Sequence, residues 1–226
     1  MIKDYIGWDV GNWSGALQFW QSKLSNESGN KVLELGAGPG GLSLWLAQMN
    51  NHVVCSDIEE PGDTVKEFHK KFNFKGQIEY GKIDALNIPY ENEFDIVIFK
   101  SIIGGVSRDG HDEKRDLMMA EILKVLKPNG IFLFAENTAG SKMHSLFRRI
   151  FIKWGSSWNY PTVNELTDSL SIFNDVNYET TGFLGTFGRT EWQRNILSQI
   201  DQKFLKYIVP SSWNYIMYGV AYKSPA

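Results

Sequence analysis

Cysteine is almost absent from this sequence: among 226 residues there is one, Cys55. A single thiol excludes a disulfide framework and a zinc site built from several cysteines, and it indicates a reducing compartment. A chain of this length with 42% hydrophobic residues is able to bury about 70% of its unfolded surface on folding. We therefore expect one compact domain whose core needs neither a disulfide nor a metal ion.

Long hydrophobic runs are also missing. The longest apolar stretches, Phe94–Phe99 and Ile131–Ala135, are much shorter than the roughly 20 residues that span a bilayer, and Met1–Trp8 contains no apolar run typical of a secretory signal. An excess of positive charge is absent as well, because 23 basic and 26 acidic residues leave a formal net charge of −3. These absences predict a cytoplasmic protein with no membrane partner and no general attraction to nucleic acid, and they specify no oligomeric state.

Short apolar runs rich in β-branched residues alternate with segments of helical length through the first 135 residues. Strands are predicted at 31–35, 52–56, 77–82, 94–99 and 130–135. Helices are predicted at 40–49, 64–72 and 111–126, the last ending at the turn residues 128–130. Repeated alternation of strand and helix indicates an α/β fold with a parallel sheet and helices on both faces.

Further helices are predicted outside this central part. Residues 11–24 have the pattern of an amphipathic helix ahead of the first strand. Thr162 and Glu165 have the spacing of a capping box, which predicts a short helix ending at Leu170. A longer helix is predicted at 190–207.

Two late strands, at 176–183 and 213–222, suit an antiparallel pair at one edge of the sheet. We therefore expect a single domain over residues 1–226. Its expected parts are an N-terminal helical segment (1–30), a central half (31–135) and a second half with inserted helices (136–226).

The strongest local signal is Val32–Ser43, with the sequence VLELGAGPGGLS. A predicted strand runs into glycines and then into a predicted helix, so the backbone turns tightly, approaches a ligand closely and points the first helical amides at it. Asp57 follows the next strand, where a carboxylate is placed to accept both hydroxyls of a ribose. Gly36, Gly38 and Gly41 also satisfy the G-x-G-x-x-G pattern, so an NAD-type oxidoreductase is an alternative.

Taken with Glu34, the loop has the form E-x-G-x-G-x-G and resembles motif I of the class I S-adenosylmethionine-dependent methyltransferases. Further matches follow in the order found in that family. Asp57 resembles its ribose-binding acid, and Asp84 resembles the residue that meets the adenine amino group. Residues 88–99 resemble its loop and fourth strand, and 126–130 its turn before the fifth strand. Together the matches span the predicted central half and are far more specific than the glycines alone.

The resemblance implies a Rossmann-like, seven-stranded, mostly parallel sheet with an antiparallel edge strand, helices on both faces, an N-terminal helix and inserted lid helices. It implies S-adenosyl-L-methionine as cofactor and methyl transfer to an oxygen or nitrogen of a small-molecule acceptor. It implies no metal ion, because the metal-dependent catechol-type relatives resemble one another in an aspartate after the fourth strand, where this chain has Lys100 and Ser101. The residues expected on this basis to bind the cofactor are Glu34, Gly36, Ala37, Gly38, Pro39, Gly40, Asp57, Ile58, Asp84, Ala85 and Lys100.

In-line methyl transfer requires donor and acceptor about 3–3.5 Å apart with water excluded, so few side chains need to react covalently. An alcohol or ammonium acceptor still has to lose a proton to a base. His144 follows the fifth predicted strand and is our first candidate, with Glu136 and His111 as alternatives, because ligands of open α/β sheets bind beyond the carboxyl ends of strands. His52 and His69 are predicted to be structural.

A nucleic-acid substrate is a second hypothesis. Asn87–Tyr90 resembles the N-P-P-Y signature of base-amino methyltransferases at three of four positions, but it precedes the fourth predicted strand, whereas the signature follows it. A basic run after the fifth strand suits either contact with phosphate or one solvated helix face. It comprises Lys142, His144, Arg148, Arg149 and Lys153. A third hypothesis is a cofactor-binding regulatory subunit without catalysis.

Tryptophan is abundant, with eight residues among 14% aromatics. Only Trp45 lies within 31–135, so seven tryptophans belong to the flanking segments, which in the family typically form a lid over the acceptor. Flat aromatic faces pack on sugar or aryl rings and attract cations, which favours a small acceptor with a ring or an amine, such as a sugar-derived compound. We expect Trp20, Trp192 and Trp213 to pack added helices against the sheet. The residues expected to contact the acceptor are Tyr5, Trp13, Trp154, Trp158 and Tyr160.

Overall fold

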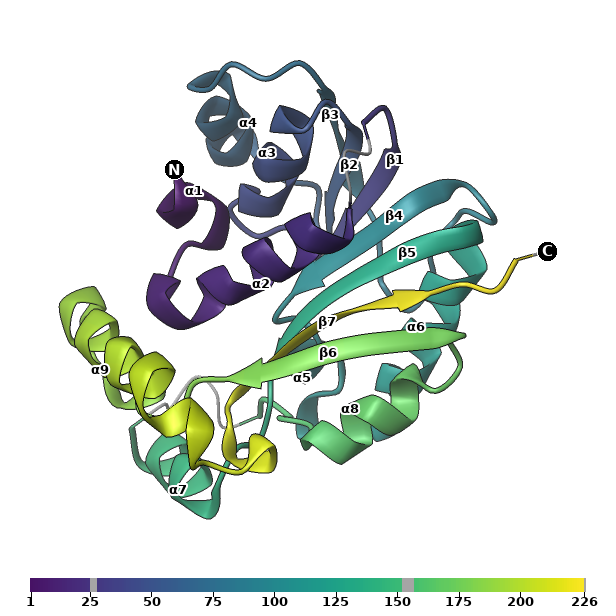
Figure 1. The fold of residues 1–226 in the computed structure, drawn as a ribbon. Helices are drawn as coiled ribbons and strands as arrows, with labels where there is room; N and C mark the ends of the chain where they lie inside the picture. The colour runs from purple at the N-terminus through teal and green to yellow at the C-terminus, as the bar shows by residue number, and fades with distance from the viewer. Residues whose placement is uncertain (25–27, 152–156, 226) are drawn as a thin grey trace.

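The computed structural model describes residues 1–24, 28–151 and 157–225. Within these ranges the chain forms a seven-stranded sheet in the order β3-β2-β1-β4-β5-β7-β6 (Figure 1). The strands β1 to β5 pair in parallel, and β7 pairs antiparallel with both of its neighbours. Their bounds are β1 Lys31–Leu35, β2 His52–Asp57, β3 Gln77–Lys82, β4 Phe94–Lys100, β5 Leu126–Asn137, β6 Asp175–Thr181 and β7 Ile216–Tyr222.

The antiparallel pair that the sequence predicts lies at one edge of this sheet, as expected. The reversed strand is β7, however, and it lies between β5 and β6, so that β6 forms the outer edge. The long connection through residues 182–215 lets the chain return alongside β5, whose apolar residues offer the larger buried surface to pair with.

Alternate strand residues face two separate cores, because successive side chains of a strand point to opposite faces. On one face Val32 and Ile98 pack with α1 (Ile2–Ile6), α2 (Val10–Lys23) and α3 (Gly41–Gln48). On the other face Leu33 and Phe99 pack with α5 (Ile103–Val106), α6 (Asp112–Val125) and α8 (Val163–Leu170). The helix α4 (Asp63–Lys70) lies at the β3 end, where His69 stacks on Tyr80. The sheet therefore has helices on both faces, as predicted.

Some boundaries differ from the sequence prediction for local reasons. The helix α6 ends at Val125, before the turn residues, because a proline at 128 disfavours helical backbone at Lys127. The predicted helix at 190–207 divides into α9 (Glu191–Lys203) and the single 3-10 turn η4 (Leu205–Tyr207). Residues 211–213 form another such turn, η5, so β7 begins three residues later than predicted.

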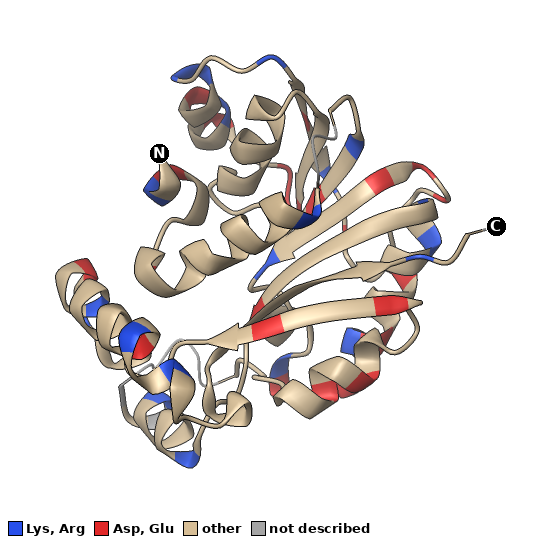
Figure 2. Cartoon of the chain, viewed as in Figure 1, with Lys and Arg blue, Asp and Glu red and all other residues tan. Residues whose placement is uncertain are grey.

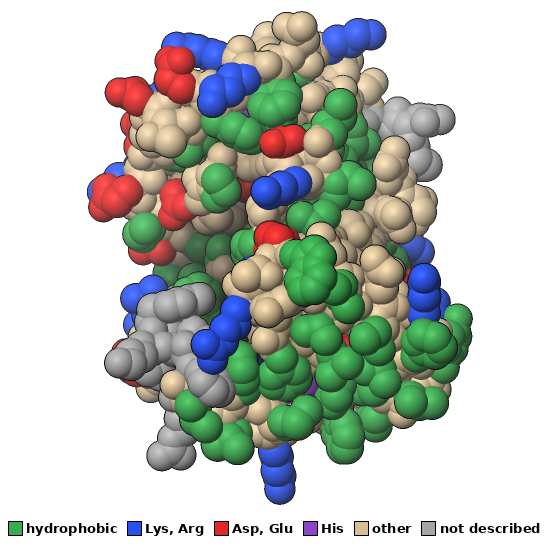
Figure 3. All heavy atoms as spheres, turned by 90° about the vertical axis from the view of Figure 1, so that its left-hand side faces the viewer, with side chains coloured by type: hydrophobic (Ala, Val, Ile, Leu, Met, Phe, Trp, Pro, Cys, Tyr) green, Lys and Arg blue, Asp and Glu red, His purple; other side chains and the backbone are tan. Residues whose placement is uncertain are grey.

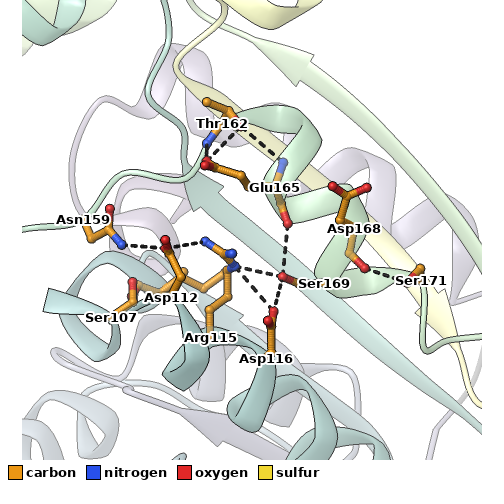
Figure 4. Close-up of polar contacts among 11 residues, drawn as sticks. Ser107, Asp112, Arg115, Asp116, Asn159, Thr162, Glu165, Asp168, Ser169 and Ser171 are labelled. Atoms are coloured by element: carbon orange, nitrogen blue, oxygen red, sulfur yellow. Dashed lines mark hydrogen bonds and ion pairs between the residues drawn. The ribbon is translucent and has the colours of Figure 1, made fainter. Parts of the chain in front are cut away.

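A polar network joins α6 to α8 and to the loop before α8 (Figure 4). Arg115, only 6% exposed, donates from Nε to Ser169 Oγ at 2.8 Å and pairs with Asp112 Oδ1 at 3.0 Å. Asn159 donates to the same Asp112 oxygen at 2.9 Å. At the start of α8, Thr162 forms the predicted capping box. The network holds the loop containing residues 158–160 in place.

The segments after β5 form a layer beyond the carboxyl ends of the parallel strands (Figure 1). It contains α7 (Lys142–Phe151), the 3-10 turn η3 (Gly185–Phe187) and α9. His144 of α7 stacks on Phe187 of η3 with ring centroids 5.1 Å apart, and α9 packs against both η3 and α2. No helix among the described residues is long and apolar enough to cross a membrane.

Candidate active site

A cavity of about 540 Å³ opens at the carboxyl ends of β1, β4 and β5. Its walls come from the glycine loop after β1, the connection between α1 and α2, the strand ends, and the layer formed by α7, η3 and α9. The lining residues are Tyr5, Ile6, Gly7, Trp8, Asp9, Glu34, Gly36, Ala37, Gly38, Pro39, Gly41, Leu42, Lys100, Ser101, Asn137, Arg148, Trp158, Tyr160, Thr186, Arg194 and Tyr215.

The glycine loop forms the floor of this cavity. Gly36 and Gly38 have φ of +62° and +51°, in the left-handed region that side chains disfavour. A Cβ on Gly36 would lie 2.4 Å from Cγ2 of Ile102, whereas a Cβ on Gly38 would meet no protein atom within 4 Å. Gly36 is therefore required by the packing of the protein, and Gly38 keeps open space above the loop.

Two carboxylates hold this loop in shape. Glu34 is 2% exposed and accepts hydrogen bonds from the amide (2.8 Å) and the hydroxyl of Ser43, at the start of α3. Burial raises the pKa of Glu34 to about 7, although the Ser43 hydrogen bonds oppose the shift. Asp57 Oδ2 accepts from the Gly38 amide at 3.0 Å, so the end of β2 is tied to the loop after β1.

His69 supports the loop from the side of α4. Its Nε2 lies 2.7 Å from the Gly40 carbonyl and its Nδ1 lies 2.9 Å from the Tyr80 hydroxyl. The ring is 2% exposed, and burial lowers the pKa of His69, which keeps it neutral. The structural role predicted for His69 matches this geometry, although the histidine lies next to the loop rather than away from it.

Five of the residues that the resemblance assigns to the cofactor are not among those that line the cavity, namely Gly40, Asp57, Ile58, Asp84 and Ala85. Ile58 follows Asp57 and is 57% exposed. Asp84 lies beyond β3, where its carboxylate accepts from the Leu86 amide at 2.9 Å. Ala85 packs against the core on the face of α6. These residues extend from the Asp57 side of the loop along the same sheet edge.

Lys100 ends β4 and faces the cavity next to two indole rings. Its Nζ lies 4.7 Å from the ring centroid of Trp8 and 4.4 Å from that of Trp13. Burial lowers the pKa of Lys100 to about 8, while the charges of Glu136 and Asp9 act in the opposite direction. The aromatic faces also favour the charged amine. The result is a lysine that titrates close to neutral pH inside the cavity.

The connection between α1 and α2 is fastened to the far side of the cavity by buried polar groups. Asp9, 1% exposed, accepts from the hydroxyl of Tyr215, and burial raises the pKa of Asp9 to about 6. Asn12 donates to the same tyrosine oxygen at 2.8 Å. Asp201 of α9 accepts from the amides of Leu184 and Gly185 at 2.8 and 3.0 Å. The N-terminal segment and the layer after β5 are therefore joined across the cavity.

The wall opposite the glycine loop is aromatic and cationic. The Arg148 guanidinium lies 3.9 Å from the ring centroid of Tyr160, and its Nη1 donates to the carbonyls of Thr138 (2.9 Å) and Ala139 (3.0 Å). Trp158 lies beside Tyr160 with centroids 6.5 Å apart. Three basic groups thus line the cavity, since Arg194 of α9 and Lys100 also face it.

The structure does not place the predicted bases in this cavity. His144 is 0% exposed, its Nδ1 accepts from Ser141, and its Nε2 lies 2.7 Å from the Phe183 carbonyl, so neither ring nitrogen is free. His111 lies at the exposed start of α6 beside Glu113, outside the residues that line the cavity. We therefore do not retain either histidine as the base.

Glu136 is also committed to the fold. Its Oε2 accepts from the amides of Ile102 and Ile103 at 2.9 and 2.8 Å, and its Oε1 accepts from Asn137 at 2.9 Å. Burial raises the pKa of Glu136 to about 7. With three amides on one fully buried carboxylate, this residue holds α5 against the end of β5 rather than meeting an acceptor.

The predicted lid aromatics divide into three groups. Tyr5, Trp158 and Tyr160 line the cavity, as expected for contact with an acceptor. Trp13 is 0% exposed and lies beneath Trp8, edge to face at 5.4 Å. Trp154 lies outside the described residues.

Three tryptophans were expected to pack helices against the sheet, and one does. Trp20 is fully buried and donates to the Gly219 carbonyl at 2.9 Å. The prediction is wrong for Trp192 and Trp213, which are 71% and 49% exposed. The inward face of α9 carries the polar Ser198 and Asp201 in place of Trp192, and Trp213 lies in the exposed turn η5. Helical position alone does not show which face is covered.

The two sequence features weighed for nucleic acid do not form an exposed surface suited to it. In the Asn87–Tyr90 segment Ile88 is buried and Tyr90 packs edge to face on Phe94 at 5.2 Å. The basic run of α7 is not one solvated face, because His144 and Arg148 turn inward.

Sequence reasoning missed several lining residues, namely Trp8, Asp9, Asn137, Arg148 as a wall residue, Thr186, Arg194 and Tyr215. Most of them carry no local motif and reach the cavity only through tertiary packing. Trp8 had a signal, since it lies just ahead of the predicted helix 11–24. Among the described residues no group of three or more His, Cys, Asp or Glu side chains is placed to hold a metal ion.

Comparison with known proteins decides the family. The model of a family described as "Methyltransferase domain" matches residues 26–180. The chain belongs to this methyltransferase-domain family. Membership removes the dinucleotide-dependent oxidoreductase alternative that the glycine pattern left open.

The curated relatives that the chain matches are named for different acceptors. A fatty-acid O-methyltransferase of Mycolicibacterium smegmatis is 27% identical over 109 residues, which cover 48% of this chain and 37% of the relative. A ubiquinone/menaquinone biosynthesis C-methyltransferase of Saccharophagus degradans is 30% identical over 49% of this chain and 44% of its own. The chain thus spans less than half the length of these curated relatives.

The fold extends further than the sequence similarity. The solved phosphoethanolamine N-methyltransferase 2 of Haemonchus contortus, in complex with S-adenosyl-L-methionine, superposes with a TM-score of 0.63 at 17% identity, over 94% of this chain and 53% of that one. At this identity the similarity establishes the methyltransferase fold, including the Rossmann-like sheet with its antiparallel pair at one edge.

Proposed function

We propose that this protein is an S-adenosylmethionine-dependent methyltransferase that acts on a small molecule. The observation that carries the proposal is the glycine loop, which forms the floor of a cavity of about 540 Å³ and which Asp57 ties to the end of β2. Family membership supports the reaction, and the S-adenosyl-L-methionine bound in the Haemonchus contortus enzyme supports the cofactor.

The loop residues fit this cofactor. The open space above Gly38 admits a ligand backed by Ala37 and Pro39, and Asp57 at the neighbouring strand end is placed to accept ribose hydroxyls. Asp84 beyond β3 is the candidate for the adenine side. When bound, S-adenosylmethionine supplies an electrophilic methyl group on its sulfonium sulfur. The protein's own contribution is to position the acceptor and to exclude water.

The acceptor side is formed by Trp8, Trp158 and Tyr160 together with the basic wall. Flat aromatic faces suit a ring, and cations at the wall attract an anionic group on the acceptor. We propose an oxygen or nitrogen nucleophile on a small molecule of this kind, with sugar-derived compounds among the classes to test.

Lys100, which the resemblance assigned to the cofactor, is instead our candidate base in place of His144. It faces the cavity, and a pKa of about 8 leaves roughly a tenth of the amine neutral at pH 7. Turnover should therefore rise as pH increases through 8, and K100M should lower turnover and abolish that rise while cofactor affinity stays within about threefold of the wild type. An unchanged pH profile in K100M would remove Lys100 from the mechanism.

Calorimetry with S-adenosylhomocysteine and with NAD⁺ tests the cofactor. We expect binding of the first and none of the second, and the reverse result would overturn the proposal.

A methyl-release assay against fatty acids, phenols, amines, sugars and RNA then tests the acceptor class. Transfer to RNA alone, surviving only at low salt, would refute the small-molecule acceptor.

A further inference from the structure

The helix α9 exposes its apolar face and buries its polar face. Trp192, Ile196, Ile200 and Phe204 recur every four residues along one side and are 71%, 42%, 36% and 65% exposed. The opposite side carries Ser198 and Asp201, each 3% exposed and turned toward α2 and η3. Residues four apart lie on one helix face, so the exposed residues form a continuous apolar stripe. The stripe continues into Tyr207 and Ile208, both 75% exposed.

The helix α7 has the same inverted arrangement. Met143, Leu146 and Ile150 follow helical spacing and are 49%, 58% and 56% exposed. His144 and Arg148, which are polar, are the residues that turn inward. Both helices contact η3, so their exposed faces belong to one side of the molecule. In Figure 3, which views this side, hydrophobic side chains gather over the lower part of the molecule.

We name this surface the apolar face. It comprises Met143, Leu146, Ile150, Trp192, Ile196, Ile200, Phe204, Tyr207, Ile208 and Trp213, all at least 36% exposed. Exposed apolar residues are common singly, but a contiguous set of this size marks a surface that contacts a partner or a lipid phase.

The charge around the apolar face is opposite to that of the whole chain. Segments 137–164 and 182–215 contain eight Lys and Arg residues against two acids, although the chain as a whole carries −3. The two acids are Asp201, which is buried, and Glu191, which pairs with Arg194 at 2.8 Å. In Figure 2 the blue ribbon segments that mark Lys and Arg occur along α7 and α9. The apolar face is therefore bordered by uncompensated positive charge, including the exposed Lys142, Lys203 and Lys206.

We propose that the apolar face docks the protein on the surface of an anionic membrane. Apolar side chains flanked by lysines enter the boundary between head groups and acyl chains, and the lysines meet anionic lipid. A second copy of the chain suits the face less well, because a two-fold contact would bring this basic surface against itself. The surface lies in the plane of the bilayer, since no described helix is suited to cross it.

Docking in this way would place the cavity next to the lipid. Arg148 of α7 and Arg194 of α9 line the cavity from the two helices that carry most of the apolar face. The proposal goes beyond methyl transfer and does not require it, since binding to lipid is measured without any reaction. It also revises the expectation from composition that the protein has no membrane partner.

Flotation with vesicles tests the proposal directly. The intact protein should float with phosphatidylcholine vesicles that contain phosphatidylglycerol, and the floated fraction should fall as salt is raised. W192S/F204S should lower the partition constant at least tenfold, and K203E should lower it roughly fivefold on anionic vesicles, the equivalent of about 1 kcal/mol per lysine. The matched control is L117S/I172S, which removes two apolar side chains of 47% and 46% exposure elsewhere and should float like the wild type.

Three results would overturn the proposal. The first is a wild type that does not float, and the second is a W192S/F204S variant that floats as well as the wild type. The third is a dimer, found by light scattering, that W192S/F204S dissociates; this result would assign the apolar face to a second copy of the chain. All of the substituted side chains are exposed, so thermal unfolding of each variant should match the wild type and show that the fold is intact.

Discussion

An alanine at Gly36 and an alanine at Gly38 should damage different properties of this protein. Both positions have positive φ, so either alanine carries a left-handed strain of about 1–2 kcal/mol. At Gly36 the new Cβ would also lie 2.4 Å from Cγ2 and 3.4 Å from Cβ of Ile102, a β-branched side chain that cannot rotate away freely. At Gly38 it would meet only open space above the loop.

The magnitudes follow from this difference. Overpacking adds about 1–3 kcal/mol, so G36A should destabilise the fold by about 2–5 kcal/mol and G38A by about 1–2 kcal/mol. For a domain of this size each kcal/mol lowers Tm by about 2–4 °C. G38A should instead lose at least tenfold in affinity for S-adenosylhomocysteine, because its methyl group occupies the space that the loop leaves for the ligand.

Thermal unfolding without ligand and calorimetry with S-adenosylhomocysteine separate the two effects. The double variant G36A/I102A isolates the clash between the new Cβ and Ile102. Because I102A removes Cγ2, the loss of unfolding free energy in the double variant should be at least about 1 kcal/mol smaller than the sum of the losses in the two single variants. Equal Tm values for G36A and G38A, or strictly additive effects in the double variant, would refute the argument. So would an unchanged affinity in G38A.

Three further predictions concern the carboxylates of Glu34, Asp57 and Asp201. Burial raises the pKa of Glu34 from 4.5 to about 7, so between these pH values the folded state binds more protons than the unfolded state. The free energy of unfolding of the wild type relative to E34Q should therefore fall as pH rises from 5 to 7.5, by at most about 3 kcal/mol. Denaturant titrations at several pH values would measure this difference. D57A should weaken the binding of S-adenosylhomocysteine at least tenfold, while Tm falls by only a few degrees because the carboxylate accepts from one amide of the glycine loop. D57N keeps an acceptor oxygen and should lose less affinity than D57A. D201A leaves two amides of the Leu184–Gly185 turn without their acceptor and should cost about 2–4 kcal/mol in urea unfolding, whereas the exposed control D168A should cost under about 0.5 kcal/mol.

The central half of the molecule was predictable because its signals are local. A strand of apolar residues, a turn that needs glycine and a helix that follows are each specified within about ten residues of sequence. Asp57 and Asp84 follow from the same logic, because the carboxyl ends of neighbouring parallel strands meet at one sheet edge. The capping box at Thr162 was predictable for the same reason, since both of its hydrogen bonds close within four residues.

The acceptor side was not predictable because it depends on which way side chains turn after distant segments pack. His144 lies after β5, where a base is useful, yet α7 rotates it inward to bond Ser141 and Phe183. Trp192 lies in a regular helix, yet α9 turns its polar residues to the protein and this tryptophan to the outside.

By itself, then, the sequence determined a parallel α/β sheet with a glycine loop at its carboxyl edge, because hydrophobic periodicity and backbone freedom act over a few residues. Only the tertiary structure decided that Trp8, Lys100 and Arg148 share a cavity and that α7 and α9 face outward with their apolar sides. Those outcomes depend on buried hydrogen bonds between residues far apart in sequence, such as Asp9 to Tyr215, whose geometry no local pattern encodes.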